Sequence, residues 1–131
     1  MTEEAVDLWP DLGSAKVRTP LAILKQQAAL LGKHTNNLLE GQVTTQTFGG
    51  EFHHRFLIEA TALDYRYELF VVSHGVKLYP VRLESGPHQA YYGSNKPKFD
   101  SEQAFVNWLK GVLNSEDTKR VLSSLLSQAE S

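Results

Sequence analysis

Two adjacent glycines at 49–50 lie between two runs of strand-forming residues, and this arrangement predicts a β-hairpin. Glycine accepts the positive φ angles that a two-residue hairpin turn requires. If the turn holds this pair, Val43 lies opposite Phe56 and Thr45 lies opposite His54. One face of the hairpin is then largely apolar and the other largely polar, whereas a shift of one residue would mix them. The sequence therefore predicts both the hairpin and its register.

Two more alternating segments follow the hairpin and predict a four-stranded antiparallel meander over residues 38–84. We expect Thr61 to pair with Arg66, which returns the chain along the second strand. A loop at 74–75 with a one-residue bulge then keeps the apolar residues of the fourth strand on the inner face. Pro80 cannot donate a ladder hydrogen bond, so this fourth strand is predicted at an edge of the sheet.

Three amphipathic helices are predicted around this sheet. Thr19 and Pro20 form a helix start, with Thr as the N-cap, and apolar residues follow at spacings of three and four. Asp100 and Ser115 are the expected N-caps of two helices after the sheet. We therefore predict an α+β fold in which the N-terminal helix and the two C-terminal helices pack on one face of the meander.

The length and composition are those of one globular domain without cysteine chemistry. We expect residues 19–131 to form a single α+β domain, preceded by an N-terminal arm over residues 1–18 that can be partly disordered. A net charge of −2 argues against binding nucleic acid through bulk charge. The absence of cysteine excludes disulfides and thiolate metal sites and fits a reducing cytoplasm.

No apolar run approaches the roughly 20 residues that span a bilayer. The acidic start of the chain also lacks the basic and apolar regions of a signal peptide. The sequence therefore predicts a cytoplasmic protein without membrane contact, and nothing in it calls for a cofactor.

In the predicted register, Glu40, Glu59 and Glu68 lie side by side on the outer face of the sheet. Such a row is typical of a divalent-cation site, or of the catalytic carboxylates of a metal-dependent hydrolase or nuclease. The other interpretation is that arginines on neighbouring strands neutralise the row on a solvated face. An acidic nuclease site would place a lysine two residues after the second acid, where this chain has Phe70.

The same register places His53 opposite His74 on the outer face, where two imidazoles could ligate zinc or copper. The sequence offers no third ligand, and a metal site needs three or four. His54 points to the opposite face and is predicted to be buried and hydrogen-bonded. The chain also lacks a Gly-x-Ser-x-Gly elbow and a glycine-rich phosphate loop.

The predicted outer face includes an apolar patch, and the segment after the sheet, residues 85–99, is a long loop with aromatic and basic residues. Each could bind a protein partner or a second copy of the chain, and the loop could also stack on single-stranded nucleic acid. Alternatively, the tyrosines pin the loop to the sheet while the lysines stay solvated. The candidate binding residues are Tyr91, Tyr92, Lys96, Lys98, Phe70 and Leu57.

The segments TPLAIL at 19–24, LDYRY at 63–67 and HGVKLYPV at 74–81 resemble segments of a family of small uncharacterised bacterial proteins with no assigned function. The resemblance includes no catalytic motif, so it implies a bacterial origin and no activity. We predict a non-enzymatic protein-interaction module of the bacterial cytoplasm, of the adaptor, chaperone-like or immunity type. The alternative is a metal-dependent hydrolase or nuclease that uses Glu59 and Glu68.

Overall fold

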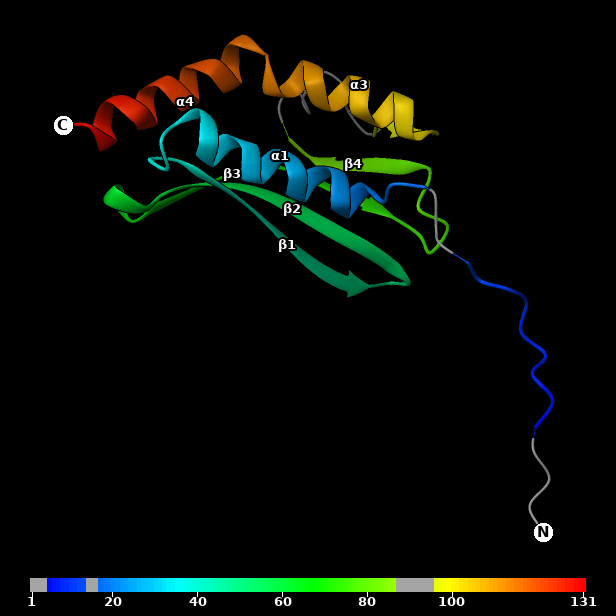
Figure 1. Cartoon of the computed structure of the whole chain (residues 1–131). Coiled ribbons are helices and arrows are strands. Elements are labelled where there is room, and N and C mark those ends of the chain that lie inside the picture. The colour runs from blue at the N-terminus through cyan, green and yellow to red at the C-terminus, as the bar shows by residue number, and fades with distance from the viewer. Residues whose placement is uncertain (1–4, 14–16, 87–95) are drawn as a thin grey trace.

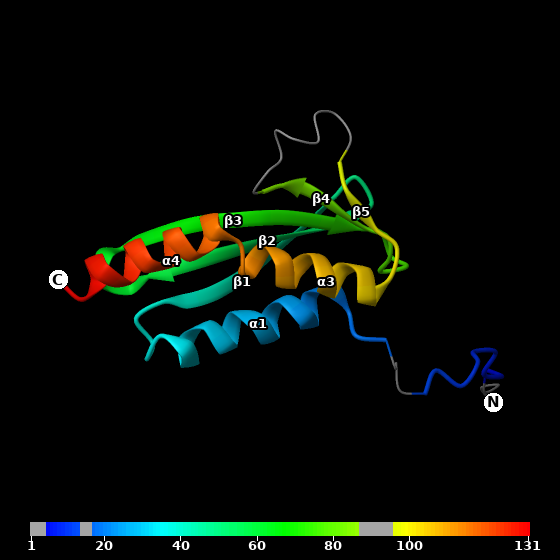
Figure 2. The ribbon, with the colours of Figure 1, turned by 90° about the horizontal axis from the view of Figure 1, so that it is seen from above.

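The computed structural model describes residues 5–13, 17–86 and 96–131, and within these ranges it shows an α+β fold of two layers. A five-stranded antiparallel sheet forms one layer and three helices form the other (Figure 1). The view from above shows the helices on one face of the sheet (Figure 2). The elements are α1 (Pro20–His34), β1 (Glu40–Phe48), β2 (Glu51–Ala60), the 3₁₀ turn η1 (Thr61–Leu63), β3 (Tyr65–His74), β4 (Val81–Ser85), β5 (Lys98–Phe99), α3 (Glu102–Leu113) and α4 (Glu116–Ala129).

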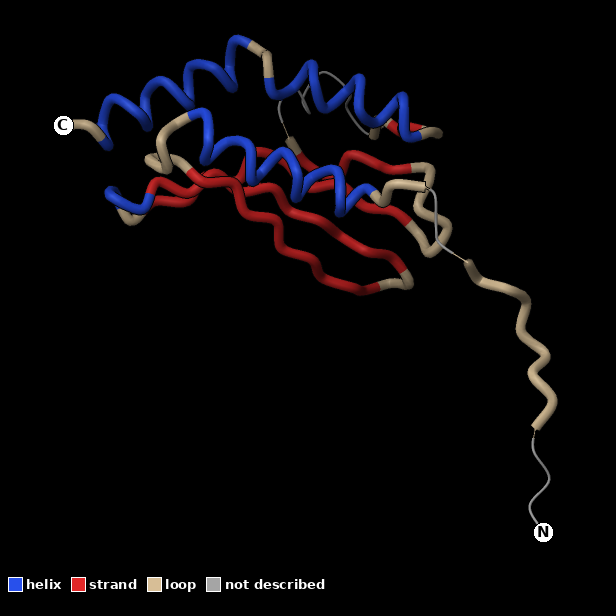
Figure 3. The backbone as a smooth tube through the Cα atoms, viewed as in Figure 1, coloured by secondary structure: helices blue, strands red, loops and turns tan. Residues whose placement is uncertain are grey.

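The β1–β2 hairpin confirms the predicted turn and register. Val43 lies opposite Phe56 and Thr45 lies opposite His54. The two turn glycines have positive φ angles of 61° and 74°. The far end of this hairpin bends away from the helical layer, as the tube in Figure 3 shows. Residues 44–48 are exposed as a result, on both faces of β1.

The sheet has five strands in the order β1-β2-β3-β4-β5, so the prediction of four strands was one short. The fifth strand is only two residues long, and its Phe99 pairs with Val81 of β4. The predicted loop contained it, because a two-residue strand has no alternating pattern to detect. Since β5 covers β4, the fourth strand is not an edge, and Pro80 lies just before it, after a cis peptide bond.

The pairing of β2 with β3 differs from the prediction. Glu59 lies opposite Arg66, not opposite Glu68. The four-residue connection begins one residue earlier than predicted, because η1 starts at Thr61 and is followed directly by Asp64 in the left-handed region at φ 51°. Ala60 therefore pairs with Tyr65, the first residue of β3, and the pairs as far as Leu57 with Glu68 are displaced by two positions from the prediction.

A bulge in this pairing then reverses the faces of the second half of β3. The register shifts by one residue between Phe56 and Leu57, so that Phe70 lies opposite Phe56. Phe70 and Val72 thereby point into the core, where both are fully buried. Burying a large apolar side chain contributes roughly 1.5–3 kcal/mol, which favours the bulged pairing over a regular ladder that would leave both in solvent.

The pairing of β3 with β4 also differs from the predicted register. Arg82 lies opposite Ser73, where we had expected it opposite Glu68. The faces of β4 are nevertheless as predicted, because Val81 and Leu83 are both buried. The alternation of apolar residues was sufficient to predict the faces, but not the position along the neighbouring strand.

Side-chain caps begin each of the three described helices. The Thr19 hydroxyl accepts a hydrogen bond from the Ala22 amide at 3.0 Å, and Ser115 caps α4 as predicted. The cap of α3 is Ser101, one residue after the predicted Asp100. Both residue types favour this position, so their order alone did not decide between them.

The helix α1 packs closely on the sheet where Gly41 of β1 faces Ala28. A Cβ atom added to Gly41 would lie only 2.5 Å from the Ala28 Cα atom. Helix and strand can therefore pack backbone to backbone only because both residues are small. The contact brings Ile23 and Leu24 into the core beside Phe56.

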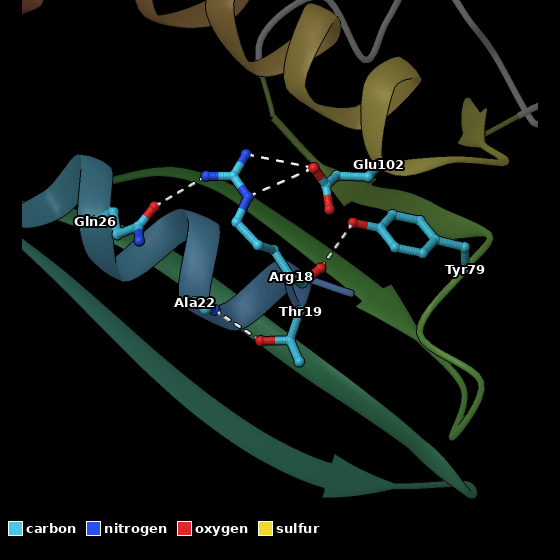
Figure 4. Close-up of polar contacts among 6 residues, drawn as sticks. All are labelled: Arg18, Thr19, Ala22, Gln26, Tyr79 and Glu102. Carbon is cyan, nitrogen blue, oxygen red and sulfur yellow. Dashed lines mark hydrogen bonds and ion pairs between the residues drawn. The ribbon is translucent and has the colours of Figure 1, made fainter. Parts of the chain in front are cut away.

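Polar contacts fix the start of α1 to the rest of the body, as the close-up in Figure 4 shows. The Arg18 guanidinium lies 3.5 Å from Glu102 at the start of α3 and donates to Gln26 at 3.3 Å. The Tyr79 hydroxyl donates to the Arg18 carbonyl oxygen at 3.4 Å. Burial, and to a smaller extent Glu102, raise the pKa of this tyrosine. The point at which the N-terminal arm leaves the body is therefore held by contacts from three parts of the fold.

Replacing Gly41 with alanine should lower the free energy of unfolding by about 1–3 kcal/mol, because the added methyl group meets backbone atoms that no rotamer change can move. Chemical denaturation measures this loss. Gly111→Ala is the matched control, since its methyl group meets nothing within 4 Å in a helix. That substitution should raise stability by roughly 0.5–1 kcal/mol. Equal effects of the two substitutions would contradict the close packing of α1 on β1.

Candidate functional site

The predicted row of three carboxylates is not formed. Glu40 and Glu59 are cross-strand partners, as predicted, but Glu68 lies opposite Leu57. The Arg66 Nε atom lies 3.1 Å from Glu59 Oε2. Glu68 is paired in the same way, with its Oε1 atom 2.8 Å from the Arg55 Nε atom. The geometry is that of a face on which arginines pair with the carboxylates.

The described residues offer no metal centre. Within 5–13, 17–86 and 96–131, no three His, Cys, Asp or Glu side chains come together in a way that could hold a metal ion. The predicted pairing of His53 with His74 was wrong, because the bulged register places His53 opposite Ser73. His53 stacks instead on Phe48, with ring centroids 3.8 Å apart and planes within 4°.

The bulge brings His54 and His74 together inside the fold. Their Nε2 atoms lie 2.8 Å apart, and both rings are almost completely buried. The Thr45 hydroxyl lies 2.9 Å from His54 Nδ1, and His74 Nδ1 lies 2.7 Å from the Gly75 carbonyl oxygen. A continuous chain of hydrogen bonds therefore links β1, β2 and β3 below the hairpin.

The carbonyl at one end of this chain determines where each proton lies. A carbonyl oxygen only accepts, so His74 donates from Nδ1 and, when neutral, accepts at Nε2. His54 must then donate from Nε2 and accept at Nδ1 from Thr45. Protonating both rings would set two N–H groups face to face at the 2.8 Å contact.

This arrangement makes His54 a poor base. Burial is the main cause that lowers its pKa to about 4, and the nearby His74, His53 and Lys25 lower it further. A neutral ring is thus maintained in the core at neutral pH, where it completes the hydrogen-bond chain. The expectation that His54 is buried and hydrogen-bonded is confirmed.

A polar cluster occupies the outer face at the ends of β3 and β4. The fully buried Ser73 donates to Glu84 at 2.7 Å, and the Lys96 ammonium group lies 2.6 Å from the same carboxylate. Burial alone would raise the pKa of Glu84, but the bonds from Lys96 and Ser73 outweigh it and hold that pKa below its usual value. Lys96, a predicted binding residue, is thus occupied by an internal ion pair.

The prediction of an exposed apolar patch on the outer face was wrong. Phe70 and Val72 lie on the inner face after the bulge, and Leu57 on the outer side is also buried. Lys98 lies in β5, where it pairs with Arg82. Tyr91 and Tyr92, the other predicted binding residues, lie outside the described part of the chain.

The sheet instead presents a long free edge at β1. Within the described residues this strand pairs with β2 alone, over nine consecutive positions and without a bulge. Natural edge strands are usually protected by lysine, proline, bulges or short length. β1 has no lysine and no proline, and its single charged residue is Glu40 at one end. The opposite edge, β5, is two residues long and carries Lys98.

The strand β1 was predicted correctly from the sequence, but its position as an unprotected edge was not. The signal was present in the letters EGQVTTQTF, a nine-residue strand with none of the usual protective residues. Recognising the unprotected edge also requires the order of the strands, in which β1 lies at one margin of the sheet and β4 is covered by β5.

Comparisons with known proteins give no relative: no family model, curated protein or solved structure matches the chain. No described helix is long and apolar enough to cross a membrane. The function is therefore inferred from the geometry of the chain itself.

The buried histidine pair should make folding stability depend on pH. Between about pH 6.5 and about pH 4 the unfolded chain protonates His54 while the folded chain does not. The free energy of unfolding should therefore fall as the pH is lowered through this window, by up to about 3 kcal/mol. Denaturant titrations at several pH values measure the slope.

His54→Gln should flatten that slope, because the amide keeps hydrogen-bonding capacity without taking up a proton. His34→Gln is the control, since His34 is exposed on α1 and the slope should remain. An unchanged slope in His54→Gln would show that the pair does not carry the pH dependence.

Proposed function

We propose that this chain is a non-enzymatic protein-interaction module that binds an extended segment of its partner by strand addition at the free edge of β1. In this mode the partner's main chain continues the hydrogen-bond ladder of the sheet. The observation that carries the proposal is the contrast between the two edges of the sheet, nine unprotected residues at β1 against two at β5.

The second half of β1 is accessible from every side that a partner strand would need. Residues 44–48 are exposed, while the first half of the strand packs beneath α1 around Gly41. Phe48 is an exposed aromatic side chain at the tip of the hairpin, beside His53. Aromatic side chains of this kind are enriched at the centres of protein interfaces.

The hairpin geometry indicates which backbone groups are available. A two-residue turn closes on a hydrogen-bonded pair, here Phe48 with Glu51, and bonding alternates from there along the ladder. Gly41, Val43, Thr45 and Thr47 therefore direct their N–H and C=O groups toward the free edge. The side chains beside them are small, β-branched or uncharged, which favours an uncharged segment of high β-propensity as the partner.

A cytoplasmic adaptor, chaperone-like protein or immunity protein would use such an edge, and the absence of cysteine supports that compartment. The alternative of a metal-dependent hydrolase lacks a supporting observation. Glu59 and Glu68 each pair with an arginine, and the described residues bring no third ligand beside them. A melting temperature raised by Mg²⁺ or Mn²⁺, and no longer raised in Glu59→Gln, would favour that enzyme.

Peptides selected on the purified protein from a random display library test the proposal. Thr47→Pro removes a free-edge N–H group but leaves the bonds between β1 and β2 in place, so it should weaken the selected peptides at least tenfold. Thr47→Val is the matched control, because it keeps the N–H group and the shape, and it should bind like the wild-type chain. Amide hydrogen exchange should slow at Gly41, Val43, Thr45 and Thr47 when peptide binds. Peptides that bind Thr47→Pro as tightly as the wild type would contradict strand addition.

A further inference from the structure

The free edge of β1 is complementary to itself. The residues that direct backbone groups toward it are spaced evenly about Thr44: Gly41, Val43, Thr45 and Thr47. When two copies of the strand lie antiparallel and are centred on Thr44, Gly41 lies opposite Thr47 of the other copy. Val43 lies opposite Thr45 in the same way. Each outward-facing residue thus meets another, which gives four hydrogen-bonded pairs of two bonds each.

The side chains of β1 suit this pairing. On the outer face Gln42 lies opposite Gln46 of the other copy, and two amides can each donate to and accept from the other. Glu40, the single charged residue of the strand, lies opposite Phe48. A parallel pairing in register would set the two Glu40 carboxylates side by side, and like charges directly opposite are destabilising. The charge of the strand therefore favours the antiparallel pairing.

The helix α1 leaves room for a second strand. Every residue of β1 keeps exposed surface, although α1 runs antiparallel to the strand above its first half (Figure 1). From Ala28, which faces Gly41, back to Pro20 the helix covers about 12 Å, the length of roughly four strand residues. It therefore begins near Thr44, at the centre of the pairing. The α1 helices of two copies would lie over opposite halves of the joined strands, each beside the half that the other copy leaves exposed.

A two-fold pairing at β1 also closes on itself. The interface is isologous, since the same strand of each copy forms it, and the pairing uses the β1 edge of both copies. The outermost strands of the joined sheet are then the two β5 strands. Each is two residues long and carries Lys98, and short edges with lysine resist further strand addition. The pairing therefore gives a defined dimer.

We propose that the partner of β1 is the β1 strand of a second copy of this chain, paired antiparallel about a two-fold axis at Thr44. The inference rests on the proposed function, because it names the partner for strand addition at the same edge. That edge favours an uncharged segment of high β-propensity. Residues 41–48 of β1 are themselves uncharged, and they include Val43, Phe48 and three threonines. The strand therefore meets the requirements of its own edge.

The absence of cysteine from the chain allows a direct test of the pairing. Thr44→Cys places one thiol of each copy at the two-fold axis, where the Cα atoms of a non-hydrogen-bonded pair lie about 4.5 Å apart. A disulfide can span this distance, so mild oxidation should convert the variant into a covalent dimer. Gln46→Cys is the matched control, exposed on the same face of the same strand. Since Gln46 lies opposite Gln42, its two thiols would be about 14 Å apart and should not cross-link.

Sedimentation velocity of the unaltered chain should show a dimer whose proportion rises with concentration. Thr47→Pro removes the N–H group that bonds to Gly41, and symmetry removes it twice in each dimer, so the Kd of the dimer should rise at least tenfold. Thr47→Val keeps this N–H group and should sediment like the unaltered chain. The measurements on the unaltered chain and on the cysteine variants do not depend on the folding of Thr47→Pro.

Three results would overturn the inference. One is a monomer at every concentration together with no cross-link in Thr44→Cys. Another is cross-linking of Gln46→Cys in preference to Thr44→Cys, which would show a different register. The last is a dimer that persists in Thr47→Pro while Thr44→Cys stays uncross-linked, which would show another interface.

The failure of this inference is distinguishable from the failure of the proposed function. A monomer that binds selected peptides, and loses them in Thr47→Pro, would overturn the pairing of two copies while strand addition at β1 stands. A monomer whose selected peptides bind Thr47→Pro unchanged would overturn both.

Discussion

The bulge between β2 and β3 is the feature on which most of this structure depends. One extra residue in β3 turns Phe70 and Val72 into the core and moves every later partner along the sheet. The same shift brings His54 against His74. A single irregularity thus determines which side chains of β3 enter the core and how the buried hydrogen-bond chain is formed.

The helical layer covers the sheet unevenly, so that one part of β1 is packed beneath α1 and the other part is exposed. Contact between Gly41 and Ala28 holds α1 close to the first half of β1. Beyond that contact the hairpin bends away from the helices, so that the second half of β1 is exposed. At the other end α1 and α4 separate and leave an apolar groove. The proposed site of strand addition is the part of β1 that the helical layer does not cover.

The sequence was sufficient to predict whatever depends on local chemistry and alternation. The Gly49-Gly50 turn, the register of β1 with β2 and the caps at Thr19 and Ser115 were all confirmed. The register of β2 with β3 was not predictable in the same way. A bulge interrupts the regular ladder by one residue, and the burial of Phe70 and Val72 compensates for that interruption. The position of the turn after β2 displaced the carboxylate row, and the bulge displaced the outer histidine pair and the apolar patch.

The unprotected edge of β1 has a consequence for the solubility of the protein. A strand that can accept one neighbour can also accept many, and the row TTQTF is uncharged from Thr44 to Phe48. When such an edge is left open, the sheets of different copies can pair edge to edge, and the product is an insoluble fibre instead of a defined complex. The residues that equip this chain to recognise another would then also limit the concentration at which it stays dissolved.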